Sequence, residues 1–214
     1  IPVVVIGNLT VGGTGKTPLV KYIASELINR GYKPGIVSRG YGGNFKETLK
    51  VTDEASVGQT GDEAQILSKL ELPFYICLFY IDKKRVRAVK TLIKNHDCDV
   101  ILSDDGLQHY KMDRDIEIAV IDGKRRFGNN LTLPAGPLRE SIHRLKTVDF
   151  IINNGGPTQE NEYLMNISPT KFVHLKSGKS YTINNWPMHK QVHAIAGLGN
   201  PGRFFDLLDK LGFD

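Results

Sequence analysis

The stretch Asn8–Val20, NLTVGGTGKTPLV, decides how the chain is expected to fold. It follows a β-branched run, PVVVIGN, and leads into a segment with apolar residues at helical spacing. A strand, a glycine-rich turn ending in Gly-Lys-Thr and a helix together indicate a phosphate-binding loop, because backbone N–H groups and the helix N-terminus converge on phosphate oxygens. The general pattern GxxxxGK[ST] places a glycine where Thr10 stands, so the match is incomplete.

Within this loop, Lys16 is expected to neutralise phosphate charge and Thr17 to hold Mg²⁺. The glycines keep the backbone flexible enough to surround the phosphates, so the departure at Thr10 does not remove the prediction. The nucleotide-binding residues predicted from the stretch are Gly12, Gly13, Thr14, Gly15, Lys16 and Thr17.

Strand and helix patterns alternate beyond the loop. Further strands are expected at Pro34–Val37, Leu72–Cys77, Asp99–Ser103 and Glu117–Asp122, and helices at Asp62–Leu70 and Lys83–Asn95. This alternation predicts an α/β fold, a three-layer P-loop NTPase-like and mostly parallel sheet, with ligands at the carboxyl ends of the strands.

The texture changes after Asp149, where FIINNGGPTQENEY is polar and reads as a boundary loop. We therefore expect a phosphate-loop core domain over residues 1–150 and the beginning of a smaller α/β domain over residues 151–214. Short strands are predicted there at Lys171–Lys176, Ser180–Ile183 and Gln191–Ala196, and then a helix capped by Asn200 with Pro201 at its first position. Because the chain starts in a strand and ends near a helix, we expect a fragment truncated at both ends.

Composition narrows the class of protein. Of the 214 residues 40% are hydrophobic, and the formal net charge is +5, which suits an anionic ligand, a membrane face or nucleic acid. The longest apolar run, FYICLFYI, is far shorter than the about 18 residues of a membrane-spanning helix. Two cysteines form no disulfide framework, which favours the cytosol.

The stretch DVILSDDGLQH provides the acidic partner that a phosphate loop needs. Asp104 and Asp105 follow a predicted strand, so one carboxylate is expected to take Mg²⁺ while the other orients a water or a hydroxyl. A tight turn closing the strand is the alternative reading. A further acid, Asp62 in QTGDEAQ, is either a base for an attacking hydroxyl or only a partner of a helix dipole.

Basic residues complete the predicted site. Arg39 and Tyr41 in SRGYGG suit a substrate phosphate or sugar, although a surface turn explains them equally well. In KKRVRAVK, a solvated basic face is the favoured interpretation from the residues alone, and a phosphate contact by Arg85 or Arg87 is the alternative. The proline-rich segment LPAGPLRE is expected to aim Arg139 and Glu140 at one spot.

These motifs carry a resemblance. GNLTVGGTGKTP, SRGYGG, GDEA, DDGLQH, IDGKRRFGN, LPAGPLRE, RLKTVD and AGLGNPGRFF occur in this order, and together they closely resemble the tetraacyldisaccharide 4′-kinase family of lipid A biosynthesis. The resemblance implies an ATP-dependent, Mg²⁺-assisted kinase that phosphorylates the 4′-hydroxyl of tetraacyldisaccharide 1-phosphate, giving lipid IVA. It further implies peripheral contact with the cytoplasmic face of the bacterial inner membrane. No nucleic-acid partner is expected, because the basic surface lacks aromatic residues interleaved with basic ones at a plausible platform, and no obligate protein partner is expected.

By the same resemblance, individual residues acquire roles. Lys16, Asp62 and Asp105 are the expected catalytic residues, and Asp62 would form a base dyad with a histidine that no histidine of this chain matches. The expected metal ligands are Thr17, Asp104, Asp105 and Glu140. The resemblance makes Arg85, Gln108, His109 and Arg139 expected substrate-binding residues, and the SRGYGG motif itself adds Arg39 and Tyr41.

A switch or partition ATPase acting on a protein or nucleic-acid partner is the alternative. Such proteins resemble this chain at GGTGKT but carry a lysine immediately before the two glycines, where Val11 stands. The discriminating observation is whether ATP turnover depends on a glycolipid acceptor or on a macromolecular partner.

Overall fold

The fold was obtained as a computed structural model, which describes the chain except for residues 53–54, 62–63, 65–77 and 198–199. The chain forms two compact units, Ile1–Met165 and Asn166–Asp214. The predicted helix Asp62–Leu70 and strand Leu72–Cys77 fall almost entirely outside the described residues. Among the helices that are described, none is long and apolar enough to cross a membrane.

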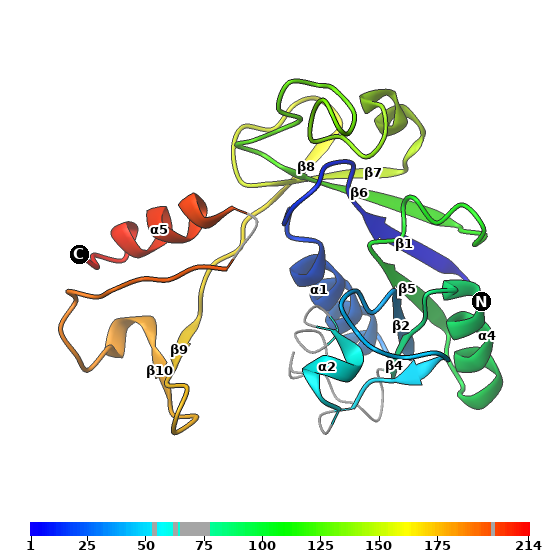
Figure 1. Cartoon of the computed structure of the whole chain (residues 1–214), viewed down its shortest axis with the longest axis horizontal. Coiled ribbons are helices and arrows are strands. Elements are labelled where there is room, and N and C mark those ends of the chain that lie inside the picture. Colours follow the sequence, from blue (N-terminus) through cyan, green and yellow to red (C-terminus); the bar gives the residue numbers. More distant parts are fainter. Residues whose placement is uncertain (53–54, 62–63, 65–77, 198–199) are drawn as a thin grey trace. The chain divides into compact units, whose positions relative to one another are not determined.

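The first unit is an eight-stranded sheet with helices packed on it (Figure 1). Its elements are β1 (Val3–Gly7), α1 (Lys16–Asn29), β2 (Pro34–Ser38), β3 (Leu49–Lys50), α2 (Val57–Thr60), β4 (Leu78–Ile81), α4 (Arg85–Asn95), β5 (Val100–Asp104), β6 (Ile116–Asp122), the 3₁₀ helix η1 (Ile142–Thr147), β7 (Phe150–Asn154) and β8 (Glu162–Met165). The strand order is β3-β4-β2-β5-β1-β6-β7-β8. Among the strands that the structure describes in this sheet, β3 pairs antiparallel with β4 and all other neighbours pair in parallel, so the predicted α/β fold with a mostly parallel sheet is confirmed.

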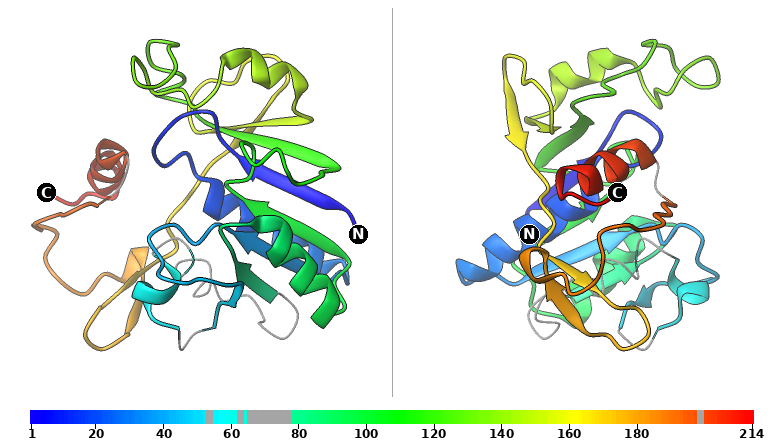
Figure 2. Two further views of the ribbon diagram at one scale, coloured as in Figure 1. Left: turned by 45° about the vertical axis from the view of Figure 1, so that its right-hand side comes forward. Right: turned by 90° about the vertical axis from the view of Figure 1, so that its left-hand side faces the viewer.

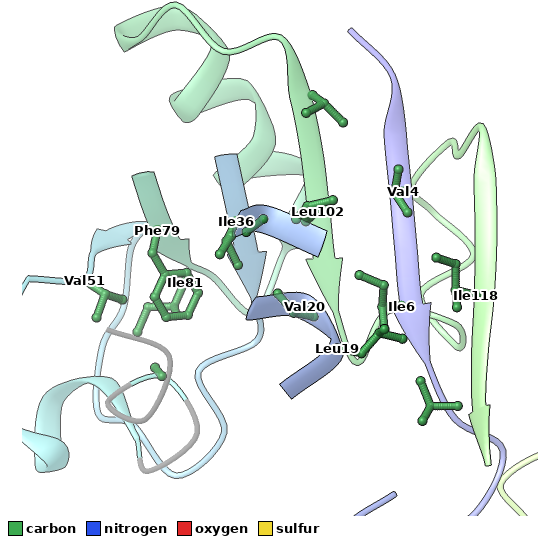
Figure 3. Close-up of a cluster of buried hydrophobic side chains, with 14 residues drawn as sticks. Val4, Ile6, Leu19, Val20, Ile36, Val51, Phe79, Ile81, Leu102 and Ile118 are labelled. Carbon is green, nitrogen blue, oxygen red and sulfur yellow. The ribbon is translucent and has the colours of Figure 1, made fainter. Parts of the chain in front are cut away.

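Both faces of the sheet are covered, which explains the continuous apolar run of β1. Successive strand residues point to opposite faces. Val4 and Ile6 pack with α1 in the cluster of Figure 3, whereas Val5 belongs to a second cluster on the other face. On that other face α4 covers the sheet (Figure 2). Its Leu92 is buried in one cluster with Val37 of β2 and Ile101 of β5. Each fully buried aliphatic side chain contributes about 1.5–3 kcal/mol.

Helix α1 begins directly after Gly15, which has a φ of 98°, and Pro18 lies in the first turn, where its missing N–H costs no hydrogen bond. Gly31, with a φ of 87°, follows the helix as its sequence predicts. Parallel pairing of β1 with both β5 and β6 brings the carboxyl ends of these three strands to one edge of the sheet. That edge carries the loop that follows β1.

The boundary stretch after Asp149 differs from its reading as a loop. Phe150–Asn154 forms β7, which pairs in parallel with β6, and Glu162–Met165 forms β8 beside it. The apolar start of the stretch enters the sheet, and the connection from β7 to β8 contains Gly155, Gly156 and Asn161 at positive φ. The first unit thus extends beyond residue 150.

The second unit contains the antiparallel strands β9 (Lys171–Val173) and β10 (Ser180–Thr182), the short 3₁₀ helix η2 (Ile183–Asn185) and α5 (Pro201–Lys210). Phe172, Trp186 and Phe213 pack edge to face, with ring centroids 4.8 to 5.6 Å apart. Asn200 is the N-cap residue of α5, as predicted. Gln191–Ala196, predicted as a strand, forms none, and the Val192 amide instead donates to the Asp214 carbonyl.

Candidate active site

The loop after β1 presents its backbone N–H groups to the crevice. None of the amides of residues 12–17 donates a hydrogen bond to any residue that the structure describes. The loop carbonyls, in contrast, are held from outside: Arg125 Nη2 donates to Gly13 O at 2.8 Å, and Asn154 Nδ2 donates to Thr14 O at 2.8 Å. Free amides in a concave loop at a helix N-terminus form an anion-binding cradle.

Thr10, the residue that departs from the loop pattern, pairs with another segment of the chain. It forms an isolated β-bridge with Leu138, flanked by hydrogen bonds from Val11 N to Pro137 O and from Arg139 N to Leu9 O. Its backbone is extended, and a bridge residue needs no glycine. The same bridge joins the loop to the LPAGPLRE segment, whose Arg139 and Glu140 side chains were predicted to act beside it.

Lys16 and Asp105 meet at the edge of the sheet. The Lys16 ammonium, whose side chain is only 9% exposed, lies 3.5 Å from Asp105 Oδ1. Arg139 Nη1 lies 2.9 Å from both carboxylate oxygens of Asp105. Burial by itself would raise the pKa of Asp105, but the charges of Lys16 and Arg139 outweigh it and hold that pKa below its ordinary value. Asp105 is therefore ionised at neutral pH.

The two neighbouring aspartates differ in environment. Asp104, the last residue of β5, is 1% exposed, whereas the Asp105 side chain is 25% exposed and lines a cavity. Asp105 has a φ of 50°, which turns it out of the strand. Arg85, itself buried, fixes this turn by donating from Nη2 to the carbonyls of Asp104 at 3.0 Å and Asp105 at 2.6 Å. Burial lowers the pKa of the Arg85 guanidinium, and the two carboxylates oppose that effect.

The cavity beside Asp105 has a volume of about 550 Å³. All six predicted substrate-binding residues line it, from four segments of the first unit, together with Val11, Ser38, Lys83 and Leu133. Its lining is strongly basic, and burial together with Arg85 and Arg114 lowers the pKa of His109, so that this imidazole is neutral at pH 7. A cavity of this size and charge suits an anionic ligand. The predicted residues that it brings together are Arg39, Tyr41, Arg85, Gln108, His109 and Arg139.

Gln108 links Arg139 to Glu140. Its Oε1 accepts from Arg139 Nη1 at 3.3 Å, and its Nε2 donates to Glu140 Oε1 at 2.7 Å and to Asn8 O at 3.0 Å. Arg139 and Glu140 were expected to be aimed at one spot, and both side chains contact the Gln108 side chain. The alternative assignment of a phosphate contact to Arg87 does not fit, because Arg87 is paired with Asp82 instead and does not line the cavity.

The residues present fit a magnesium ion that takes most of its ligands from phosphate and water. Mg²⁺ sites of this kind need only one or two carboxylates and no all-protein cage. In the described part of the chain no three His, Cys, Asp or Glu side chains gather as a metal cluster. Asp105 supplies an ionised carboxylate beside Lys16, whereas Thr17 and Glu140 share no contact with each other. Asp62 lies outside the described residues.

Several contacts have no counterpart in the sequence reading. Arg125 and Asn154 hold the phosphate loop, and Lys83 lines the cavity. Tyr110 and Arg144 contact Glu140. Arg125 stands in IDGKRRFGN and Arg144 in RLKTVD, so the motifs of the resemblance were the available signal; Asn154 lay in the stretch read as a loop.

Comparison with known proteins places this geometry in a family. The family model described as Tetraacyldisaccharide-1-P 4′-kinase, LpxK, matches residues 1–214. The chain is 48% identical to the tetraacyldisaccharide 4′-kinase of Shewanella frigidimarina, covering 100% of this chain and 62% of that protein. It is 48% identical to the Ruthia magnifica enzyme of the same name, covering 100% of this chain and 66% of that protein. The chain thus spans somewhat less than two thirds of these relatives.

A solved structure agrees. The crystal structure of LpxK from Aquifex aeolicus in complex with ATP superposes with a TM-score of 0.78 at 28% identity, covering 100% of this chain and 69% of that one. The fold, the ordered motifs and the family model all agree over the whole chain. The chain belongs to the tetraacyldisaccharide 4′-kinase (LpxK) family.

Proposed function

We propose that the complete protein is an ATP-dependent kinase that transfers the γ-phosphate to the 4′-hydroxyl of tetraacyldisaccharide 1-phosphate in lipid A biosynthesis. The observation that carries the proposal is the Lys16–Asp105 pair at the mouth of the amide cradle, with the basic cavity beside it. The cradle suits the nucleotide phosphates, and the cavity suits an acceptor that carries a phosphate of its own. Names of the relatives support the same reaction.

Phosphoryl transfer demands positioning and electrostatic stabilisation more than covalent chemistry from the protein. In the proposed mechanism the amides of residues 12–17 and Lys16 bind the β and γ phosphates. Arg139 and Arg85 face the charge that spreads over the transferred group, and Asp105 orients the reacting groups. Arg39, Tyr41, Gln108 and His109 bind the acceptor from the cavity wall.

Thr17, Asp104, Asp105 and Glu140 are the proposed residues for Mg²⁺. When bound, the ion would neutralise charge on the phosphate oxygens. Asp62 is the proposed acceptor of the hydroxyl proton, from its sequence motif alone. Asp62→Ala should therefore slow transfer and leave ATP binding intact, because a base acts on the hydroxyl and not on the phosphates.

The proposed location is the cytoplasmic face of the inner membrane, with peripheral contact, because the acceptor is a lipid. A switch ATPase is not favoured. Proteins of that class carry lysine where Val11 stands. The Val11 amide N–H donates to Pro137 O, and the residue forms part of the cavity wall.

The test is transfer of labelled γ-phosphate from ATP to tetraacyldisaccharide 1-phosphate in detergent, by the complete gene product. Labelled lipid whose formation requires the acceptor supports the proposal. ATP hydrolysis without acceptor, and no labelled lipid, would reject it in favour of the switch ATPase.

A further inference from the structure

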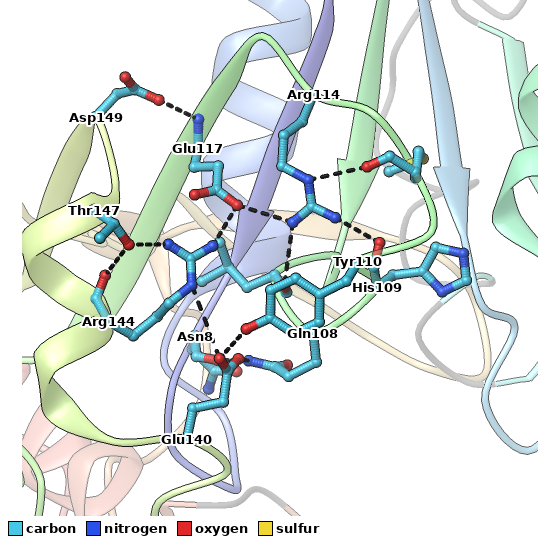
Figure 4. A network of polar contacts seen from close by, with 12 residues as sticks. Asn8, Gln108, His109, Tyr110, Arg114, Glu117, Glu140, Arg144, Thr147 and Asp149 are labelled. Atoms are coloured by element: carbon cyan, nitrogen blue, oxygen red, sulfur yellow. Dashed lines mark hydrogen bonds and ion pairs between the residues drawn. The ribbon is translucent and has the colours of Figure 1, made fainter.

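Glu140 is held at both carboxylate oxygens. Its Oε1 accepts from Gln108, and its Oε2 accepts from the Tyr110 hydroxyl (Figure 4). Arg144 Nε lies 3.8 Å from the same Oε2, so a positive charge stands behind the hydroxyl donor. A carboxylate fixed at both ends has one orientation; both hydrogen-bond donors come from the segment after β5, and η1 supplies the Arg144 charge.

The Tyr110 ring lies against two guanidinium groups. The Arg114 guanidinium carbon is 5.5 Å from the ring centroid, and that of Arg144 is 5.9 Å away. Cation–π contacts of this kind hold the ring in place. Charged groups on two segments therefore set the ring, and its hydroxyl donates to Glu140 Oε2.

Both guanidinium groups are fixed by one acid. Glu117, which is 8% exposed, accepts at Oε1 from Arg114 Nη1 at 2.8 Å and from Arg144 Nη2. Arg114 also donates from Nη1 to Leu107 O at 3.1 Å. Burial alone would raise the pKa of Glu117, but the hydrogen bonds from Arg144 and Arg114 keep it below its ordinary value. Two cations and two anions therefore form a balanced cluster in which Glu140 is the member that faces Gln108.

We propose that Tyr110, together with Arg144, is a positioning residue that sets Glu140 for magnesium binding, an inference that rests on the proposed function. We name Tyr110, Arg114, Glu117 and Arg144 the tyrosine clamp. None of the four lines the 550 Å³ cavity, so the clamp acts through Glu140 and not by touching the acceptor. Residues that orient metal ligands typically change metal affinity or activity by about 10- to 100-fold when they are replaced.

The test uses the complete gene product with a non-hydrolysable ATP analogue and follows Mg²⁺ binding to the complex by calorimetry. Tyr110→Phe keeps the ring and removes the hydroxyl. We expect the Mg²⁺ concentration for half-saturation to rise about tenfold, with unchanged binding of the analogue without Mg²⁺ and an unchanged melting temperature. Tyr163→Phe on β8, at a tyrosine that is 59% exposed, is the matched control and should behave as wild type.

A double variant separates positioning from general stability. In a Glu140→Gln background, Tyr110→Phe should add no further loss of Mg²⁺ affinity, because the group that it positions has gone. Arg144→Lys, which keeps the charge and loses the planar fork, should give an intermediate shift and serves if Tyr110→Phe folds poorly. Wild-type Mg²⁺ affinity in Tyr110→Phe would overturn the proposal. So would a loss of affinity for the ATP analogue that is equal in the presence and in the absence of Mg²⁺.

The outcome is separable from the proposed function. If the wild-type protein binds Mg²⁺ with the analogue but phosphorylates no glycolipid, the proposed reaction fails while the clamp is still judged by the Mg²⁺ titration. If transfer occurs and Tyr110→Phe titrates as wild type, the kinase proposal stands and the clamp is rejected.

Discussion

Asn154 and Thr14 are 140 residues apart in sequence, yet the Asn154 amide nitrogen donates a 2.8 Å hydrogen bond to the Thr14 carbonyl. The bond ties the carboxyl end of β7 to the phosphate loop. Both residues are buried, and Thr14 is 1% exposed. Because this carbonyl is held on the outside of the loop, the amides on either side of it remain directed at the crevice.

Removing this bond should weaken nucleotide binding. Asn154→Ala leaves the buried Thr14 carbonyl without its amide donor, which costs about 1–3 kcal/mol, and we expect ATP to bind about tenfold more weakly. Calorimetric titration of the complete protein with ATP measures the change. Asn95→Ala, an exposed position at the end of α4, is the control. Unchanged ATP affinity in Asn154→Ala would show that the loop keeps its shape without β7.

The two glycines before α1 should respond differently to a methyl group. Gly15 has a φ of 98°, and a Cβ there would lie 2.3 Å from Asn154 Nδ2, whereas a Cβ on Gly13 would meet nothing within 4 Å. Gly15→Ala is expected to destabilise the fold by about 1–3 kcal/mol and to impair ATP binding, while Gly13→Ala should change stability little. Urea denaturation of both variants checks this, and equal destabilisation would contradict the loop geometry.

Lys16→Ala and Asp105→Ala are each expected to reduce phosphoryl transfer by orders of magnitude, because the two groups face one another where the phosphates would bind. Lys21→Ala is the control, because it removes the same charge from α1 at a position outside the site. Transfer of labelled phosphate in detergent is the measurement. Near-normal turnover in either site variant would rule out this location for the chemistry.

Cys98 gives a pH dependence of stability. Burial raises the pKa of this thiol from 9.0 to about 11 in the folded chain. Above pH 9 the unfolded chain loses the thiol proton while the folded chain keeps it, so the thiol lowers the free energy of unfolding as pH rises from 9 to 11. The slope is up to about 1.4 kcal/mol per pH unit. Cys98→Ala should remove this part of the slope in denaturation curves, and an unchanged slope would contradict the assignment.

Much of the sheet follows from local sequence. The β-branched run of β1 and the helical spacing of α1 leave little choice of structure, and β5 and β6 are apolar runs of strand length. The apolar run Phe74–Ile81 is longer than one strand needs, and its second half forms β4 while the predicted strand Leu72–Cys77 lies outside the described residues. β7 was missed because Asn153 and Asn154 end it with residues typical of turns.

The site could be predicted where backbone pairing sets it. Asp105 meets Lys16 because β1 and β5 are parallel neighbours, and their carboxyl ends share an edge. The contacts of Tyr110 with Glu140 and of Asn154 with Thr14 depend on irregular segments that meet far from their places in the sequence. The spacing of residue types along the sequence does not reveal contacts of this kind, so sequence patterns alone do not predict them.

Thr10 has a consequence for protein engineering. Thr10→Gly would restore the general loop pattern, yet it would place the most flexible residue in the bridge to Leu138. The added freedom of the unfolded chain would favour unfolding. The segment that carries Arg139 and Glu140 would also be held less rigidly against the phosphate loop. A motif search would rank that variant as the better nucleotide binder, whereas the structure ranks it as the worse one.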